Sequence, residues 1–136
     1  MQEYRGECLC GAVRYRVRAE APRAMYLCHC TRCRKETGTI HGANVFFRDG
    51  ELEYERGEAQ LSRFALEGTR KKRVFCSTCG SPMPRQDPNG MIVLPAGSLD
   101  DDHGLEPTAH IFCNSRAGWT DRAERAERLP EGPQRG

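Results

Sequence analysis

The segment Cys28-His29-Cys30-Thr31-Arg32-Cys33 contains three of the eight cysteines of this chain, and four more lie in Cys8-Leu9-Cys10 and Cys76-Ser77-Thr78-Cys79. Cys-x-Cys and Cys-x-x-Cys segments each deliver two thiolates, and segments far apart in sequence can meet to complete a tetrahedral zinc site. Four of the seven cysteines can close one site. The other three can form a second site with a vacant position. A closed zinc site stabilises a fold, whereas an open one can carry out chemistry.

A disulfide framework is the competing interpretation of these cysteines. The residues after Met1 are polar or charged, and no apolar segment of a signal peptide follows them. We therefore expect a reducing, cytoplasmic compartment, in which clustered cysteines are more often metal ligands. Cysteines one or two residues apart are also poor disulfide partners, because they close very small loops. Both arguments favour zinc.

Size and composition predict one small domain over residues 1–136. Only 38% of the residues are hydrophobic, and 14 Gly and 8 Pro indicate many turns, so metal ions would reinforce a thin core. The 21 basic and 19 acidic residues nearly balance, which makes nucleic acid or a membrane surface an unlikely partner. No apolar run has the length of a membrane-spanning helix.

The pattern of apolar residues predicts mainly β structure. Val13, Tyr15 and Val17 alternate with arginines, which is typical of a strand with one buried face, and the first cysteine pair lies in the turn before it. Further strands are expected over residues 43–47, 51–55, 60–64, 73–76, 91–94 and 108–113. A short helical turn is expected over 31–36. A charged C-terminal tail is expected from about 120 to 136, with a short helix over 120–129 and a frayed end after Pro130.

Three segments of the chain resemble the glutathione-dependent formaldehyde-activating enzyme family, also called the centromere-protein-V-like family. The matching segments are Gly6-Glu7-Cys8-Leu9-Cys10-Gly11-Ala12-Val13, Cys28-His29-Cys30-Thr31-Arg32-Cys33-Arg34 and Phe75-Cys76-Ser77-Thr78-Cys79-Gly80. Downstream, Ala96-Gly97-Ser98-Leu99-Asp100, His110-Ile111-Phe112 and Trp119 are also similar to the family. The resemblance covers nearly the whole chain, in order.

This resemblance implies a fold, an activity and a cofactor. The implied fold is a compact Mss4-like β fold of small antiparallel sheets stapled by zinc. The implied activity is that of a carbon–sulfur lyase, which in the archetype condenses formaldehyde with glutathione to S-hydroxymethylglutathione. The implied cofactor is zinc in two sites, and the implied partner is a small thiol, glutathione in the archetype.

The resemblance also divides the cysteines between the two sites. It makes Cys8, Cys10, Cys76 and Cys79 the ligands of the structural zinc. It makes Cys28, Cys30 and Cys33 the ligands of the second zinc, which is the catalytic one. Three thiolates leave a zinc centre with a net charge of about −1, which suits it to hold a substrate thiol as a thiolate that attacks an electrophilic carbon. With one ligand fewer, this site is expected to bind its metal more weakly and to be partly empty.

Several residues near the second site are candidates for supporting roles. Arg32, Arg34 and Lys35 are candidates for binding a substrate carboxylate, and the alternative is that they are solvated surface cations. His29 lies between two ligands, so we expect its side chain to point away from the metal and to donate an orienting hydrogen bond. His110 is expected to be a structural histidine.

Two features stay open. Cys113 is expected to be a buried thiol that acts as a small hydrophobe, and the alternative is a fourth thiolate that closes the second site. The basic run Arg70-Lys71-Lys72-Arg73 is expected to be a solvated turn and strand start, and the alternative is a clamp for an anion. The phenylalanines and Trp119 are expected in the core rather than on a base-stacking platform.

Two functions of different class remain. The first is a zinc enzyme that acts on a thiol and an aldehyde, which requires an open three-cysteine site. The second is a non-catalytic Mss4-like zinc module that binds a protein or nucleic-acid partner, which predicts a closed or shielded second site. The coordination number at Cys28, Cys30 and Cys33 distinguishes them. A cysteine-rich metal store is disfavoured, because an ordered β pattern surrounds the clusters.

Overall fold

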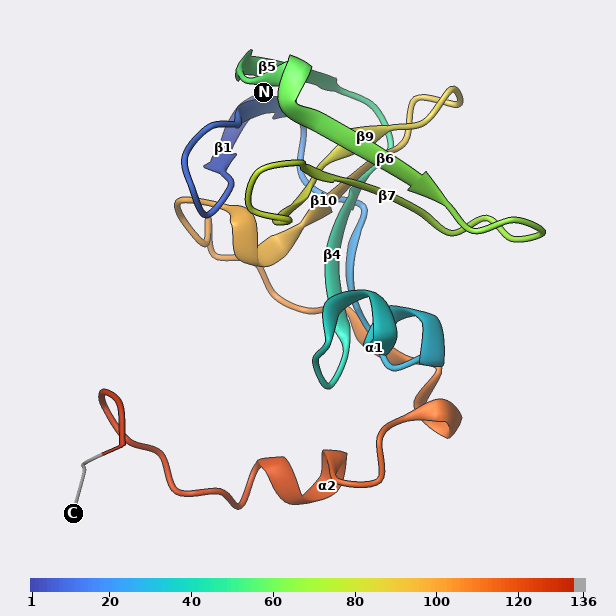
Figure 1. Cartoon of the computed structure of the whole chain (residues 1–136), viewed down its shortest axis with the longest axis vertical. Coiled ribbons are helices and arrows are strands. Elements are labelled where there is room, and N and C mark those ends of the chain that lie inside the picture. Colours follow the sequence, from blue (N-terminus) through green and yellow to red (C-terminus); the bar gives the residue numbers. More distant parts are fainter. Residues whose placement is uncertain (134–136) are drawn as a thin grey trace.

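The computed structural model describes residues 1–133 and contains three small β-sheets (Figure 1). The first sheet has the order β1-β2-β5 and is antiparallel, with β1 (Gln2–Glu7), β2 (Arg14–Ala19) and β5 (Glu51–Arg56). The alternation around Tyr15 and Val17 produces the expected strand, because both side chains are fully buried while the arginines between them face outward.

The second sheet has five strands in the order β11-β3-β4-β10-β9. These are β11 (Ala109–Ile111), β3 (Ala24–Cys28), β4 (Gly42–Phe47), β10 (Ile92–Pro95) and β9 (Arg85–Gln86). The β11–β3 pair is parallel, whereas all other pairs in this sheet are antiparallel. The expected mainly β fold of small antiparallel sheets is confirmed, and one parallel pair is added at this edge, where β11 returns to β3 after a long connection.

The third sheet has the order β6-β7-β8, with β6 (Leu61–Ala65), β7 (Lys72–Cys76) and β8 (Pro82–Met83). The helical elements are short. They are α1 (Thr31–Thr37), α2 (Thr120–Ala123) and 3-10 turns at Glu58–Gln60, Ala96–Ser98 and Cys113–Ser115.

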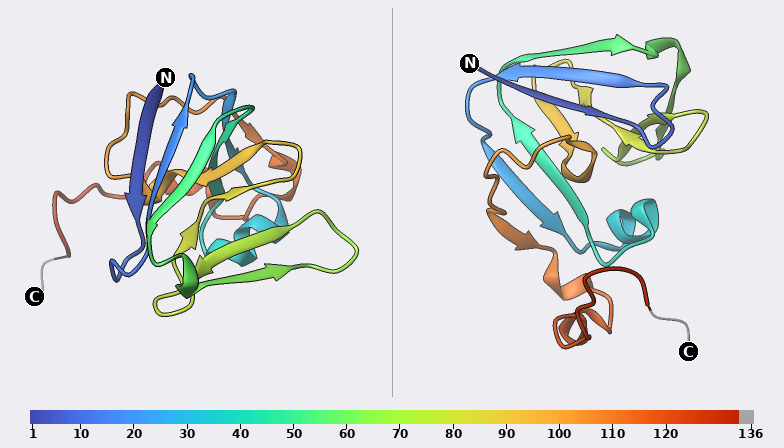
Figure 2. Two further views of the ribbon diagram at one scale, coloured as in Figure 1. Left: turned by 90° about the horizontal axis from the view of Figure 1, so that it is seen from above. Right: turned by 90° about the vertical axis from the view of Figure 1, so that its left-hand side faces the viewer.

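The C-terminal segment differs from its prediction. The helix expected over 120–129 ends at Ala123, because its residues are nearly all exposed and a short helix without packing is unstable in water. This segment lies at the end of the molecule opposite the β1-β2-β5 sheet (Figure 2). Residues 134–136 of the expected frayed tail lie outside the described part. No helix within residues 1–133 is long and apolar enough to cross a membrane.

Two groups of buried side chains form the core. The larger one lies between the first two sheets and contains Tyr4, Tyr15, Val17, Ala19, Val45, Phe47, Ile92 and Leu94. The smaller one contains Cys8, Val13, Val74, Cys76 and Met83, so it is built around cysteines from two of the predicted clusters. The aromatic residues were expected in the core, but this is wrong for Phe64, Phe112 and Trp119, which are 56%, 64% and 51% exposed.

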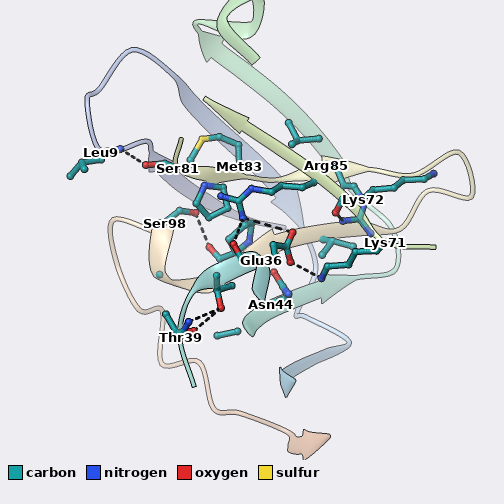
Figure 3. Close-up of a pocket in the computed structure, with 18 of the residues that line it drawn as sticks. Leu9, Glu36, Thr39, Asn44, Lys71, Lys72, Ser81, Met83, Arg85 and Ser98 are labelled. Carbon is teal, nitrogen blue, oxygen red and sulfur yellow. Dashed lines mark hydrogen bonds and ion pairs between the residues drawn. The ribbon is translucent and has the colours of Figure 1, made fainter. Parts of the chain in front are cut away.

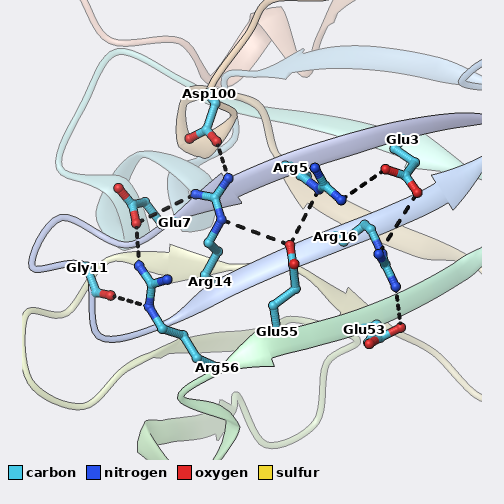
Figure 4. A network of polar contacts seen from close by, with 10 residues as sticks. All are labelled: Glu3, Arg5, Glu7, Gly11, Arg14, Arg16, Glu53, Glu55, Arg56 and Asp100. Atoms are coloured by element: carbon cyan, nitrogen blue, oxygen red, sulfur yellow. Dashed lines mark hydrogen bonds and ion pairs between the residues drawn. The ribbon is translucent and has the colours of Figure 1, made fainter.

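The arginines on the outer face of β2 are paired with acidic residues (Figure 4). Arg14 contacts Asp100 at 2.8 Å and Glu7 at 3.7 Å, and Arg16 contacts Glu53 at 2.8 Å. Exposed pairs of this kind contribute little to stability. Their effect on the surface is clearer: the basic face seen in the sequence is neutralised by its neighbours.

Candidate metal centres and the cavity between them

The structure brings Cys8, Cys10, Cys76 and Cys79 together, and we call them the four-cysteine cluster. Their sulfur atoms all lie within 4.8 Å of one another. Cys8 and Cys10 come from the turn between β1 and β2, whereas Cys76 ends β7 and Cys79 lies in the turn that leads to β8.

The two turns have the same construction. Gly11 donates its backbone N–H to the carbonyl of Cys8 at 3.0 Å, and Gly80 donates to the carbonyl of Cys76 at 2.8 Å. Both glycines have a left-handed backbone with φ of 79°, a conformation that other residues rarely adopt. The sequence Cys-x-(x)-Cys-Gly thus folds into two matching turns that present their sulfurs to one point.

The geometry of the four-cysteine cluster fits a tetrahedral zinc ion. Zn–S bonds of about 2.3 Å place sulfur atoms roughly 3.8 Å apart in a tetrahedron. The Cys8–Cys10 and Cys10–Cys76 sulfur distances are 3.6 and 3.9 Å, and all eight cysteines are free of disulfides.

The cysteines of this cluster differ in how readily they ionise. The hydrogen bond between the Cys79 sulfur and the Ser81 hydroxyl, together with nearby backbone N–H groups, lowers the pKa of Cys79 to about 5. The backbone at Ala12 lowers the pKa of Cys10, but burial and the neighbouring sulfurs outweigh this and raise that pKa to about 11.

Cys28, Cys30 and Cys33 form a second group, which we call the three-cysteine cluster. Their sulfur atoms also lie within 4.8 Å of one another. Cys28 ends β3, Cys30 caps the N-terminus of α1 and Cys33 lies in its first turn, where its N–H donates to the Cys30 sulfur at 3.3 Å. Within residues 1–133, no His, Cys, Asp or Glu joins these three at the same mutual distance. The donor set therefore fits a soft metal ion with three protein ligands.

Cys113 takes neither of its expected positions. It is exposed in a 3-10 turn after β11, so the expectation of a buried thiol is wrong. It is also absent from the three-cysteine cluster, so it does not supply a fourth thiolate there.

His29 is buried beside the three-cysteine cluster but is not part of the sulfur group. Its Nε2 atom lies 2.8 Å from Nδ1 of His110, and its ring lies edge-on to the ring of His41 at 5.0 Å. Burial, together with the two neighbouring imidazoles, lowers the pKa of His29. Its backbone N–H donates to the carbonyl of Ile111 at 2.9 Å, which ties the cluster to β11.

The cations expected to bind substrate are placed differently from the prediction. Arg32 and Lys35 are exposed on α1, and Arg34 donates to the carbonyl of Ser115 at 3.1 Å. None of the three lines the cavity described below. Their role in substrate binding stays a prediction.

Lys71 is the cation that contacts the three-cysteine cluster. Its Nζ atom donates to the Cys33 sulfur at 3.4 Å and lies 2.6 Å from Oε1 of Glu36. Burial disfavours its charge, but the Glu36 carboxylate and the Cys33 sulfur outweigh burial and raise the pKa of Lys71. Arg73 packs against the same carboxylate at 3.8 Å. The basic run is therefore not wholly a solvated turn, because two of its four members fold onto α1.

A cavity of about 480 Å³ is lined by residues that lie next to both clusters, and Figure 3 shows its lining side chains. Leu9 and Ser81 line it beside the four-cysteine cluster, and Glu36 and Lys71 line it beside the three-cysteine cluster. Its size is in the range of sites for small ligands. No local pattern in the sequence predicts this cavity, because it forms where β7 and β8 face α1, β4 and β10.

Comparison with known proteins gives three likenesses. The family model described as glutathione-dependent formaldehyde-activating enzyme matches residues 3–115. A Halomonas elongata protein named "Putative glutathione-dependent formaldehyde-activating enzyme" is 30% identical over 129 residues, which cover 90% of this chain and 82% of that protein. A crystal structure of a Rhodobacter sphaeroides protein is similar with a TM-score of 0.59 and 25% identity, over 78% of this chain and 98% of that one.

Proposed function

The chain belongs to the glutathione-dependent formaldehyde-activating enzyme family, and on this premise we propose that it joins a small thiol to an aldehyde at the three-cysteine cluster. The reaction is of the carbon–sulfur lyase type. The thiol sulfur adds to the carbonyl carbon, and the proton that leaves the sulfur ends on the carbonyl oxygen. A hydroxymethyl thioether is the product when the aldehyde is formaldehyde.

The observation that carries this proposal is the difference between the two donor sets. Four cysteines can satisfy a tetrahedral zinc ion, whereas Cys28, Cys30 and Cys33 leave one position for another ligand. A zinc ion held by these three residues would supply that position and lower the pKa of a thiol bound there.

The residues around the three-cysteine cluster support this chemistry. Lys71 places a positive charge 3.4 Å from the Cys33 sulfur, which offsets the negative charge of clustered thiolates. Glu36 fixes the position of that ammonium group at 2.6 Å. His29, which lies between two of the cysteines, is 2% exposed, and its backbone N–H donates to Ile111 at the end of β11.

Cobalt substitution tests the proposal. With Co²⁺ in the three-cysteine cluster, glutathione should change the visible ligand-field spectrum, because a further sulfur enters the coordination shell. Binding should strengthen as the pH rises toward the thiol pKa, near ~8.5 for a cysteine-like thiol, and should release a proton. Metal analysis must first show that the cluster is filled. A filled cluster whose spectrum ignores every small thiol would favour the binding-module function instead.

A further inference from the structure

The cavity between the clusters carries more positive than negative charge. Four basic residues line it, namely Lys71, Lys72, Arg73 and Arg85, against the two carboxylates of Glu7 and Glu36. Glu36 is shared by Lys71 at 2.6 Å and Arg73 at 3.8 Å, so one negative charge serves two cations. The wall nearest the three-cysteine cluster therefore keeps a net positive charge.

The other carboxylate does not cancel this excess. Glu7 forms ion pairs with Arg14 at 3.7 Å and Arg56 at 2.9 Å. Both arginines belong to the β1-β2-β5 sheet, and neither lines the cavity. Lys72 is exposed at the cavity edge, and it has no carboxylate within ion-pair distance in the described part of the chain. Arg85 is paired with Asp87 at 3.0 Å, so the excess positive charge lies on Lys72 and on the two cations that share Glu36.

Lys71 joins this cavity to the three-cysteine cluster. Its ammonium group has three N–H donors, and Glu36 and Cys33 account for two of them. The third donor is available to a ligand in the cavity that Lys71 lines. A carboxylate there would form a charge-assisted hydrogen bond in a half-buried position, where water screens it less than at an exposed surface.

We infer that this cavity binds the carboxylate end of the substrate thiol and that Lys71 is the residue that selects acidic thiols over neutral ones. This inference rests on the proposed function in one respect, which is that the ligand is a thiol. The rest of the cavity suits the stem of such a molecule, because Val74, Met83 and Val93 supply apolar surface beside the cations. Lys71, rather than the exposed cations of α1, is the specificity-determining residue.

Calorimetry with a ligand whose sulfur is blocked separates the cavity from the metal site. S-methylglutathione keeps both carboxylates but cannot act as a thiol, and its diethyl ester lacks the two charges. We expect the zinc-loaded full chain to bind the acid at least about tenfold more tightly than the ester, which is the effect of one hydrogen bond to a charged group. Lys71→Met should remove that preference and leave the weak binding of the ester unchanged.

Three further variants make the result specific. Lys71→Arg should restore most of the preference, because it restores the charge. Lys35→Met removes an exposed lysine of α1 that does not line the cavity, and should leave the preference as it is. Glu36→Gln should strengthen binding of the acid, since it frees Lys71 from its competing carboxylate. This opposite sign keeps the test valid if Lys71→Met fails to fold.

The outcomes separate this inference from the proposed function. The inference is wrong if a folded, zinc-loaded Lys71→Met variant keeps the wild-type ratio of affinities for the acid and the ester. It is also wrong if Lys35→Met, rather than Lys71→Met, loses the preference for the acid. Cys30→Ser should still bind S-methylglutathione, because the cavity does not depend on the cluster for charge. If the blocked ligand binds as described but glutathione leaves the cobalt spectrum unchanged, the inference stands and the proposed function fails.

Discussion

The four-cysteine cluster and the three-cysteine cluster use the same ligand chemistry but are assembled over very different lengths of chain. Cys10 and Cys76 are 66 residues apart in sequence, whereas the whole three-cysteine cluster lies within residues 28–33. A metal ion in the first cluster would therefore close a long loop and remove much entropy from the unfolded chain, and one in the second would not. On this comparison, a metal ion in the first cluster would contribute more to stability than one in the second.

The side chains packed around the two clusters also differ. Cys8 and Cys76 are buried in an apolar group with Val13, Val74 and Met83. The three-cysteine cluster is instead flanked by a lysine and a histidine. Apolar packing favours a permanent centre, whereas polar neighbours allow a ligand to be bound and released.

Substitution of a cysteine in the four-cysteine cluster, whose members are far apart in sequence, should have the largest effect on stability. Cys76→Ser removes one of the sulfurs that close the long loop, and structural zinc sites contribute roughly 10 kcal/mol to the folding of small zinc modules. We expect the variant to lose cooperative thermal unfolding, as followed by circular dichroism, and to lose the metal of this cluster. A variant that melts cooperatively with two zinc ions would show that the clusters do not differ in this way.

Metal removal should proceed in two steps. The three-cysteine cluster has one protein ligand fewer, so a chelator should take its zinc first, at least about tenfold faster than the other. The far-UV spectrum should stay constant during the first step and change during the second. Release of both ions in one phase, or loss of structure in the first step, would contradict the division between the clusters.

Substitution of a cysteine in the three-cysteine cluster should change the metal content more than the stability. Cys30→Ser should reduce the bound zinc from two ions to one and abolish binding of a thiol to the metal. The free energy of unfolding, from urea titration, should fall by less than about 2 kcal/mol, since no long loop is opened. Comparison with Cys76→Ser on the same scale is the control, and equal losses would refute the prediction.

The smallest effect is expected at Gly42, which packs against the three-cysteine cluster. A Cβ atom at this position would lie 3.4 Å from the Cβ of Cys33, so Gly42→Ala should shift that side chain by a few tenths of an ångström. We expect a change in stability within about 1 kcal/mol, together with faster zinc release from this cluster alone. Gly97→Ala is the control, because its Cβ would meet no atom within 4 Å.

The cysteine clusters and most strands could be predicted from the sequence, because their signals are local. Spacing identified the three cysteine segments, the family resemblance divided them between two sites, and alternation identified β2 around Tyr15. Four strands were missed: β1, β3 and the two-residue strands β8 and β9. In β1 only Tyr4 and Gly6 face the interior, and a glycine does not register as an apolar residue. In β3 the residues from Ala24 to Cys28 form an apolar run without alternation.

The cavity and its cation could not be predicted, because they depend on contacts between distant elements. Lys71 reaches Cys33 across 38 residues of sequence, and this contact exists only because β7 packs beside α1. In the sequence Lys71 is one of four similar basic residues, and no local pattern distinguishes it from Lys72. Sequence proximity instead favoured the cations of α1, which the fold directs to solvent or to the loop at Ser115.

The parallel pairing of β11 with β3 has a consequence for the synthesis of this protein. As the chain leaves the ribosome, β3 can pair with β4 early, but its other edge must wait for β11. His29 and His110, which mark this junction, are 81 residues apart, and translation at 5–20 residues per second needs roughly 4 to 16 s for that length. During this interval an apolar strand edge next to three free thiols is open to other chains. The nascent chain is therefore most vulnerable to aggregation and oxidation at the segment where its metal site will form.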